Sequence, residues 1–161
     1  GSIFLLVKRK NNNFKSKFFS KLINEEKKMG INDLGYYKKF KKRIDKIGEE
    51  TIKVLKSIKN KNIKLIGYGA SHSTTILIHQ FGLNRFLNFI VDDNKIKQGL
   101  FSPGFHIPVF EGKKIYEKFK NSVVVLAWQH QNKIIQKNKK YLKRGGKFII
   151  PLPSLKVIKN K

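Results

Sequence analysis

The sequence contains no cysteine, and only ten of its 161 residues are acidic. The absence of cysteine excludes disulfide bonds and zinc sites built on thiolates. An apolar run at residues 3–7 is too short for a membrane span or a signal peptide. The histidines lack the spacing of metal ligands, so we expect no metal site; they are His72, His79, His106 and His130. These absences favour a cytoplasmic protein without a membrane segment.

The scarcity of acidic residues leaves a net charge of +26, which can indicate nucleic-acid binding. Of the 36 basic residues, only four are Arg, the side chain that reads guanine with two hydrogen bonds. The other 32 are Lys, which shares A/T-rich codons with the abundant Ile and Asn. The basic residues are also scattered rather than interleaved with exposed aromatic residues. The charge therefore favours a solvated basic surface, and a nucleic-acid-binding module is an alternative supported by charge alone.

The hydrophobic pattern predicts helices first and then an alternation of strands and helices. The N-terminal part is predicted as a strand at 2–10, a polar loop or frayed helix at 11–21, a short helix ending near Met29, and a long amphipathic helix at 34–59. Beyond residue 62 the predicted strands are 63–68, 86–91, 123–127 and 147–150, and the predicted helices are 73–82, 112–119 and 132–142.

Strands that alternate with helices are typical of right-handed βαβ units around a parallel sheet. We therefore predict an α/β fold, a Rossmann-like three-layer domain. Its sheet should be mainly parallel, with about four or five strands, and should be preceded by a long helix and an N-terminal strand.

The junction of the strand at 63–68 with the following helix has the most informative pattern. The apolar run ends at Gly67-Tyr68-Gly69-Ala70, and hydroxyl side chains follow at Ser71, Ser73, Thr74 and Thr75. Helix N-terminal N–H groups next to small residues favour an anion, usually phosphate. Gly67 and Gly69 match the first two glycines of a dinucleotide fingerprint, but His72 stands at the third position. The turn fits either a nucleotide site or a tight turn without a ligand.

The strand at 86–91 ends in Asp92-Asp93-Asn94. Rossmann proteins place a ribose-binding carboxylate near this point, so Asp92 is a candidate ligand contact. The alternative is that the two acids cap a turn, because Asp-Asn sequences favour turns.

The segment 95–109 has too many glycines and prolines to be regular, and it begins where ligands bind in α/β folds. Lys95, Lys97 and Gln98 could meet a phosphate, and His106 could make a polar contact. The alternative is a structural loop held by its prolines and by buried Phe101 and Phe105. At the end of the third strand, Trp128 could stack on a base or sugar, or pack over the sheet edge.

Four linked motifs resemble a known family. They are GYGASHSTT, VDDNKIKQGLFSPGFHIPV, VVLAWQHQNKIIQKN and RGGKFIIPLP. In order and spacing they resemble the C-terminal domain of SAM-dependent sugar C-methyltransferases, over residues 34–153. The opening GSIFLLVKRK resembles the end of the methyltransferase domain that precedes it in this family. The resemblance implies that residues 1–33 are the end of a preceding methyltransferase domain or a linker, and that residues 34–161 are the C-terminal Rossmann-like domain.

The resemblance implies an enzyme of three parts: a cysteine-rich zinc domain, a SAM-binding methyltransferase domain, and this C-terminal domain. SAM and the catalytic base would belong to the middle domain, acting in cis or in trans. We therefore expect no catalytic residue and no cofactor within this chain. The C-terminal domain would help enclose a nucleotide-linked keto-deoxysugar, such as a dTDP-sugar, and nucleic acid is not an expected partner despite the charge.

The substrate-binding residues that the motifs imply are Gly67, Gly69, Ala70, Ser71, Ser73 and Thr74 at the turn, and Asp92, Lys97, Gln98 and His106 beside it. Trp128 joins this set from the third strand. Ser73 departs from the family, because many relatives have Lys at this position. The alternative, supported by Gly67, Gly69 and Asp92, is a stand-alone Rossmann-like domain that binds NAD or SAM and has its own small-molecule activity.

Overall fold

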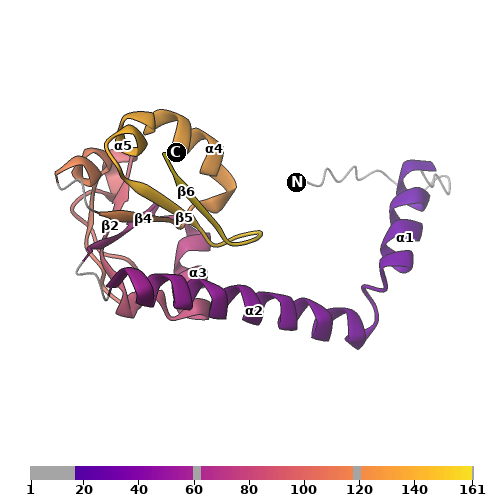
Figure 1. Cartoon of the computed structure of the whole chain (residues 1–161). Coiled ribbons are helices and arrows are strands. Elements are labelled where there is room, and N and C mark those ends of the chain that lie inside the picture. Colours follow the sequence, from indigo (N-terminus) through magenta and orange to yellow (C-terminus); the bar gives the residue numbers. More distant parts are fainter. Residues whose placement is uncertain (1–16, 60–62, 118–120, 161) are drawn as a thin grey trace. The chain divides into compact units, whose positions relative to one another are not determined.

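The computed structural model describes residues 17–59, 63–117 and 121–160 (Figure 1). The predicted strand at 2–10 and the last residues of the predicted helix at 112–119 lie outside these ranges. The chain divides into two compact units, Gly1–Lys42 and Arg43–Lys161. Among the described residues, none of the helices has the length and apolar character needed to cross a membrane.

The described part of the first unit contains helix α1 (Lys17–Met29) and the first turns of helix α2 (Leu34–Lys59). Helix α1 ends where predicted. Gly30 follows it with a left-handed φ of 73°, and the Gly30 N–H donates to the Lys27 carbonyl at 3.0 Å. Glycine suits this position because it adopts positive φ without steric cost.

The second unit is an α/β domain, as predicted. Its elements are the rest of α2, β1 (Leu65–Tyr68), α3 (His72–Phe81), β2 (Leu87–Asp92), β3 (Val109–Glu111), β4 (Ser122–Val125), α4 (Gln131–Lys137), α5 (Lys139–Lys143), β5 (Lys147–Ile150) and β6 (Lys156–Lys159). Short 3₁₀ helices lie between them: η1 (Leu83–Arg85), η2 (Lys95–Lys97), η3 (Gly112–Tyr116) and η4 (Trp128–His130).

The strands form one six-stranded sheet in the order β3-β2-β1-β4-β5-β6. The first five strands are parallel, and β6 runs antiparallel to β5. This is the Rossmann strand order, with a switch point between β1 and β4 where chain connections leave in opposite directions. The four predicted central strands are all present. The structure adds the edge strands β3 and β6, neither of which the hydrophobic pattern indicated.

The sheet is covered on both faces, which gives the three predicted layers (Figure 1). Helices α2 and α3 pack on one face through residues that include Leu55, Leu77 and Ile78, and α4 and α5 pack on the other through Ile134 and Tyr141. All four residues of β1 and of β4 are buried, because side chains on both faces contact helices. The central strands are therefore continuous apolar runs.

Two predicted helices differ in detail. The one at 112–119 begins as the 3₁₀ helix η3, and the one at 132–142 is two short helices that meet at Asn138. The Asn138 side chain, which is 3% exposed, donates to the Ile134 carbonyl at 2.8 Å. A buried amide that bonds the backbone competes with regular helix geometry, which accounts for the break.

Candidate functional site

The candidate site lies at the carboxyl ends of β1, β2 and β4, beside the switch point of the sheet. Strand β1 ends at Tyr68, and Gly69 turns the chain toward α3 with a φ of 98°. A Cβ on Gly69 would lie 2.4 Å from the Cβ of Ala127 and 3.1 Å from its backbone nitrogen. Glycine is therefore required here by its φ and by the close approach of the chain after β4.

Gly67 has a different environment from Gly69. It is buried inside β1, and a Cβ there would lie 2.5 Å from Leu126 Cδ1 and 3.1 Å from Ile90 Cγ1. It therefore permits close packing between β1 and its two neighbouring strands. The structure does not bring Gly67 to the surface where the other turn residues lie.

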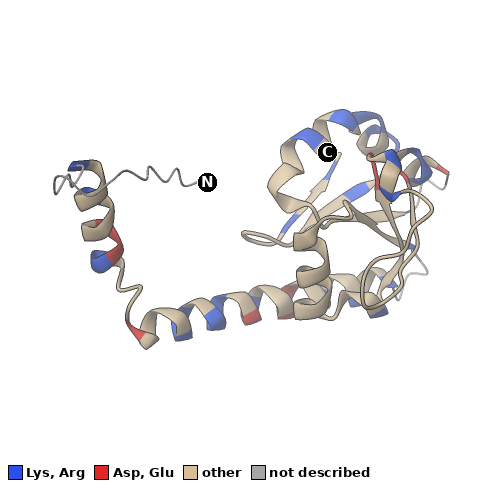
Figure 2. Cartoon of the chain, turned by 180° about the vertical axis from the view of Figure 1, so that it is seen from behind, with Lys and Arg blue, Asp and Glu red and all other residues tan. Residues whose placement is uncertain are grey.

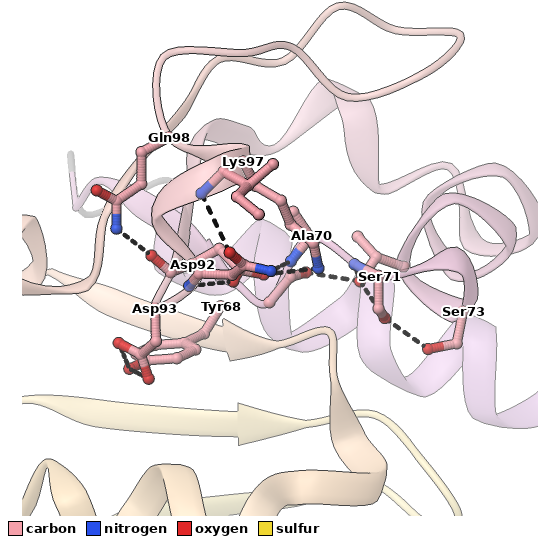
Figure 3. A network of polar contacts seen from close by, with 12 residues as sticks. Tyr68, Ala70, Ser71, Ser73, Asp92, Asp93, Lys97 and Gln98 are labelled. Carbon is pink, nitrogen blue, oxygen red and sulfur yellow. Dashed lines mark hydrogen bonds and ion pairs between the residues drawn. The ribbon is translucent and has the colours of Figure 1, made fainter.

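Most N–H groups of the turn are already bonded within the protein (Figure 3). The Gly69 N–H donates to the Val91 carbonyl at 2.8 Å, and the Ala70 N–H donates to Asp92 Oδ2 at 2.6 Å. The Ser71 N–H donates to Thr74 Oγ1 at 3.2 Å. The turn predicted as a phosphate cradle is thus largely satisfied by its own neighbours.

Asp92, at the end of β2, stabilises this turn. Its Oδ2 also lies 3.5 Å from Lys97 Nζ, and its Oδ1 accepts from the Asn94 N–H at 2.8 Å. Each carboxylate oxygen of Asp92 thus accepts one backbone hydrogen bond within the protein. The bond from the Asn94 N–H matches the turn-capping alternative.

Hydroxyl groups and Gln98 complete the polar rim of the turn. Ser71 Oγ lies 2.9 Å from Ser73 Oγ and 3.2 Å from Thr74 Oγ1, and the Thr74 hydroxyl donates to the Gly69 carbonyl at 2.6 Å. Gln98 Nε2 donates to the backbone carbonyl of Asp92 at 3.0 Å. Ser71 and Ser73 are partly exposed, so their hydroxyls are accessible to a ligand.

Two hollows adjoin the turn. One, of about 260 Å³, lies between α3 and the segment before β3, and we call it the apolar hollow; its walls include Ser71, Thr74, Thr75, Leu100, Phe101 and Pro103. The other, of about 320 Å³, lies between the strand ends and α4, and we call it the cationic hollow; it is bordered by Lys97, His130, Lys133 and Lys137 with Asp92 and Asp93. Ser71 and Lys97 border both hollows.

A polar network that the sequence analysis missed forms one wall of the cationic hollow. The buried Tyr68 hydroxyl donates to the Asp93 carboxylate, 3.1 Å from Oδ1 and 3.0 Å from Oδ2, and Lys137 Nζ lies 2.7 Å from Asp93 Oδ1. Asn138 Nδ2 donates to the Tyr68 oxygen at 3.4 Å, and the Tyr116 hydroxyl donates to Asn138 Oδ1 at 3.0 Å.

This network affects the ionisation of Tyr68. The pKa of Tyr68 is raised to about 12, chiefly by burial and also by the charge of Asp93, while the hydrogen bond from Asn138 acts in the opposite direction. The phenol therefore stays protonated at neutral pH and acts as a hydrogen-bond donor. The adjacent acids Asp92-Asp93 were the one sequence signal that pointed to this network.

Other predicted residues lie apart from the two hollows. His106 is exposed, with a φ of 49°, and Trp128 is half-buried against the hydrophobic core at the start of η4. Neither of them borders the two hollows. Phe101, expected to be buried if the loop is purely structural, is 63% exposed, whereas Phe105 is partly buried. Within the described ranges, no group of three or more metal-binding side chains could hold an ion.

The basic residues extend well beyond the site. Figure 2 shows Lys and Arg on helices and strands of both units rather than on one element. The lysine residues of the candidate site are therefore distinguished from the others by their position beside the hollows and not by their charge alone.

Comparison with known proteins identifies a protein family that matches this chain. A family model described as "C-methyltransferase C-terminal domain" matches residues 1–153. The chain is also similar to "C-methyltransferase NovU" from Streptomyces niveus, with 27% identity over 140 residues, which cover 86% of this chain and 33% of that protein. The chain thus spans about a third of the length of the curated relative that it matches. The stretch matched by the family model includes the strand–helix turn and both hollows.

Proposed function

Since the chain belongs to the family of C-methyltransferase C-terminal domains, we propose that it is the nucleotide-sugar-binding part of a SAM-dependent sugar C-methyltransferase. It helps enclose a nucleotide-linked keto-deoxysugar, such as a dTDP-sugar, in the cytoplasm. A SAM-binding domain, in cis or in trans, carries out the methyl transfer. SAM supplies the methyl group when bound to that domain, and the residues of this chain bind and orient the sugar nucleotide.

The observation that carries this proposal is the cationic hollow at the switch point of the sheet. Lys97 and Lys137 are held there by Asp92 and Asp93, while Lys133, from α4, has no ion pair with any described residue. Cationic and hydroxyl groups at this edge of an α/β sheet suit the diphosphate of a sugar nucleotide. Lys133 can therefore turn its ammonium group to a ligand, and the partly exposed Ser71 and Ser73 hydroxyls are also accessible.

The same geometry supports a binding role in this proposal more than an acid–base role. Tyr68 keeps its proton because its pKa is raised, and its hydroxyl is already directed at Asp93. Asp92 and Asp93 each pair with a lysine, and Asp92 also accepts the Ala70 N–H of the turn. The proton abstraction next to the sugar ketone therefore belongs to the SAM-binding domain.

Titration of the chain with dTDP, followed by amide NMR shifts, tests this proposal. We expect saturable shifts at Ser71, Lys97 and Lys133. The amides of β6 (Lys156–Lys159), which lies at the far edge of the sheet, provide the internal control. An absence of shifts at millimolar dTDP would overturn the binding role.

The strand order and the position of Asp92 also favour a second candidate, a Rossmann-like domain that binds NAD or SAM itself. In this candidate a ribose hydroxyl would share Asp92 with the Ala70 and Asn94 N–H groups, which already donate to its carboxylate. Thermal shifts measured side by side with NAD, SAM and dTDP separate the two candidates. Stabilisation by NAD or SAM but not by dTDP would favour the second.

A further inference from the structure

The segment between η2 and β3 is an ordered arm, which we call the 99–109 arm. The Gly99 N–H donates to the Val109 carbonyl at 2.9 Å, and the Val109 N–H donates to the Leu100 carbonyl at 2.9 Å. Further along, the Ser102 N–H donates to the Ile107 carbonyl at 2.8 Å, and the buried Ser102 Oγ accepts from the Ile107 N–H at 3.1 Å. The backbone of the arm is therefore fixed, and so are the positions from which its side chains project.

The tip of the arm is attached to helix α3. The Phe105 and His79 rings lie 4.6 Å apart between centroids. This contact links the arm to the later part of α3, while the start of α3 and the arm form opposite walls of the apolar hollow. The hollow is thus built from two elements that are held together, so its shape is preformed.

Two large apolar side chains on the arm border this hollow and remain in solvent. Leu100 is 56% exposed and Phe101 is 63% exposed, although both sit on a hydrogen-bonded backbone. An aromatic face next to a shallow apolar hollow can stack on a nucleobase, because every base presents a π-face. The Thr75 and Ser71 hydroxyls on the α3 wall could bond the polar edge of such a base.

The apolar hollow adjoins the cationic hollow. Ser71 and Lys97 border both, so a ligand that crosses this boundary passes from an apolar and aromatic wall to a cluster of cations. Their volumes, about 260 and 320 Å³, together fall in the range of about 300–1,000 Å³ typical of small-molecule sites. A nucleoside diphosphate matches this arrangement, because it carries an uncharged aromatic base at one end and anionic phosphates at the other.

We infer that the sugar nucleotide binds in one orientation, with its base against Phe101 in the apolar hollow and its diphosphate across Lys97 toward Lys133 in the cationic hollow. This inference rests on the proposed function. It makes Phe101 the residue that recognises the nucleoside and Lys133 a residue that recognises the diphosphate. The diphosphate is then held beside α4 and not by the N–H groups of the Gly69 turn, which are bonded to Val91, Asp92 and Thr74.

The test measures the affinity of the full chain for dTDP and for inorganic pyrophosphate. We expect Phe101→Ala to weaken dTDP binding about tenfold and to leave pyrophosphate binding unchanged, because only dTDP carries a base. Lys133→Ala should weaken both ligands by a similar factor, about fivefold, because both carry the diphosphate. Matched controls are Ile96→Ala, an 82% exposed apolar residue of η2, and Lys143→Ala on α5; neither borders the hollows, and both should bind like wild type.

The outcomes separate the inference from the proposed function. If wild type binds dTDP but Phe101→Ala binds it equally well, the orientation is wrong and the exposed ring serves another contact. Equal losses of both ligands in Phe101→Ala would also overturn it. Intermolecular NOEs between dTDP and the Phe101 ring in wild type check the contact without a variant, and their absence at saturation contradicts it. If wild type binds neither ligand, the proposed function itself fails.

Discussion

Replacement of Tyr68 by Phe removes one buried hydroxyl from the junction of β1, β2 and α4. Tyr68 is 2% exposed, and its hydroxyl donates to Asp93 and accepts from Asn138. A hydrogen bond to a charged group contributes about 1.5–3 kcal/mol to stability, and a neutral one about 0.5–1.5 kcal/mol. Asp93 keeps Lys137, and Asn138 keeps Ile134 and Tyr116, so no partner is left without a bond. We therefore expect a loss near the low end, about 1–2 kcal/mol in the free energy of unfolding.

The raised pKa of Tyr68 makes this loss depend on pH. The phenol titrates near 10 in the unfolded chain and near 12 in the folded protein, so the unfolded state releases its proton first as pH rises. The contribution of Tyr68 is fully present below pH 10 and declines through pH 12. At pH 11 the advantage of wild type over Tyr68→Phe should be smaller than at pH 8 by about 1.4 kcal/mol.

Urea unfolding of wild type and Tyr68→Phe at pH 8 and pH 11 measures this difference. The many lysines titrate alike in both proteins, so their effect cancels when the two free energies of unfolding are subtracted. Tyr37→Phe is the control, because Tyr37 is 53% exposed and its hydroxyl makes no hydrogen bond within the described residues. Its free energy of unfolding should stay within about 0.5 kcal/mol of wild type at both pH values. The reasoning is refuted if Tyr68→Phe is as stable as Tyr37→Phe at pH 8, or if its stability deficit grows between pH 8 and pH 11.

Two further substitutions test the turn. Gly69→Ala should destabilise the fold by about 2–4 kcal/mol, because it combines a positive φ with a clash against Ala127; Gly99→Ala, with φ 81° and open space around it, should cost only about 1 kcal/mol. Equal losses in urea unfolding would mean that the contact with Ala127 is unimportant. Asp92→Asn should lower stability by about 1 kcal/mol, because charge is lost from its bonds to Ala70 and Lys97. The same variant should tighten pyrophosphate binding roughly threefold, since one negative charge leaves the rim; calorimetry showing weaker binding would contradict this account of Asp92.

Much of the fold was predictable from the sequence. The central strands are short apolar runs because both of their faces are buried, and the runs stand out against Lys-rich helices. The edge strands were not predictable in this way. Strand β3 has three residues, and β6 reads Lys-Val-Ile-Lys with mostly exposed side chains, so neither has the pattern of a buried strand. Each of these segments is a strand because of its backbone hydrogen bonds to a neighbouring strand, and the local sequence does not reveal those bonds.

The candidate site was only partly predictable. Carboxyl ends of adjacent parallel strands meet at one edge, so the sequence could place Gly69, Asp92 and Lys97 near one another. It could not show that Asp92 bonds the Ala70 N–H, because that bond depends on the register between β1 and β2. Nor could it show that Phe101 projects into solvent, because composition alone favours burial of an aromatic residue.

By itself, the sequence determined the α/β class and the position of the strand–helix turn, because apolar periodicity and glycine placement are local properties of the chain. Only the tertiary structure decided which groups of the turn remain available to a ligand. Most of the N–H groups that the motif alone suggested for phosphate donate to Asp92, Val91 and Thr74 instead. Lys97 and Lys133, which are distant in sequence, border one hollow because the parallel sheet brings the loop after β2 and the start of α4 to the same edge.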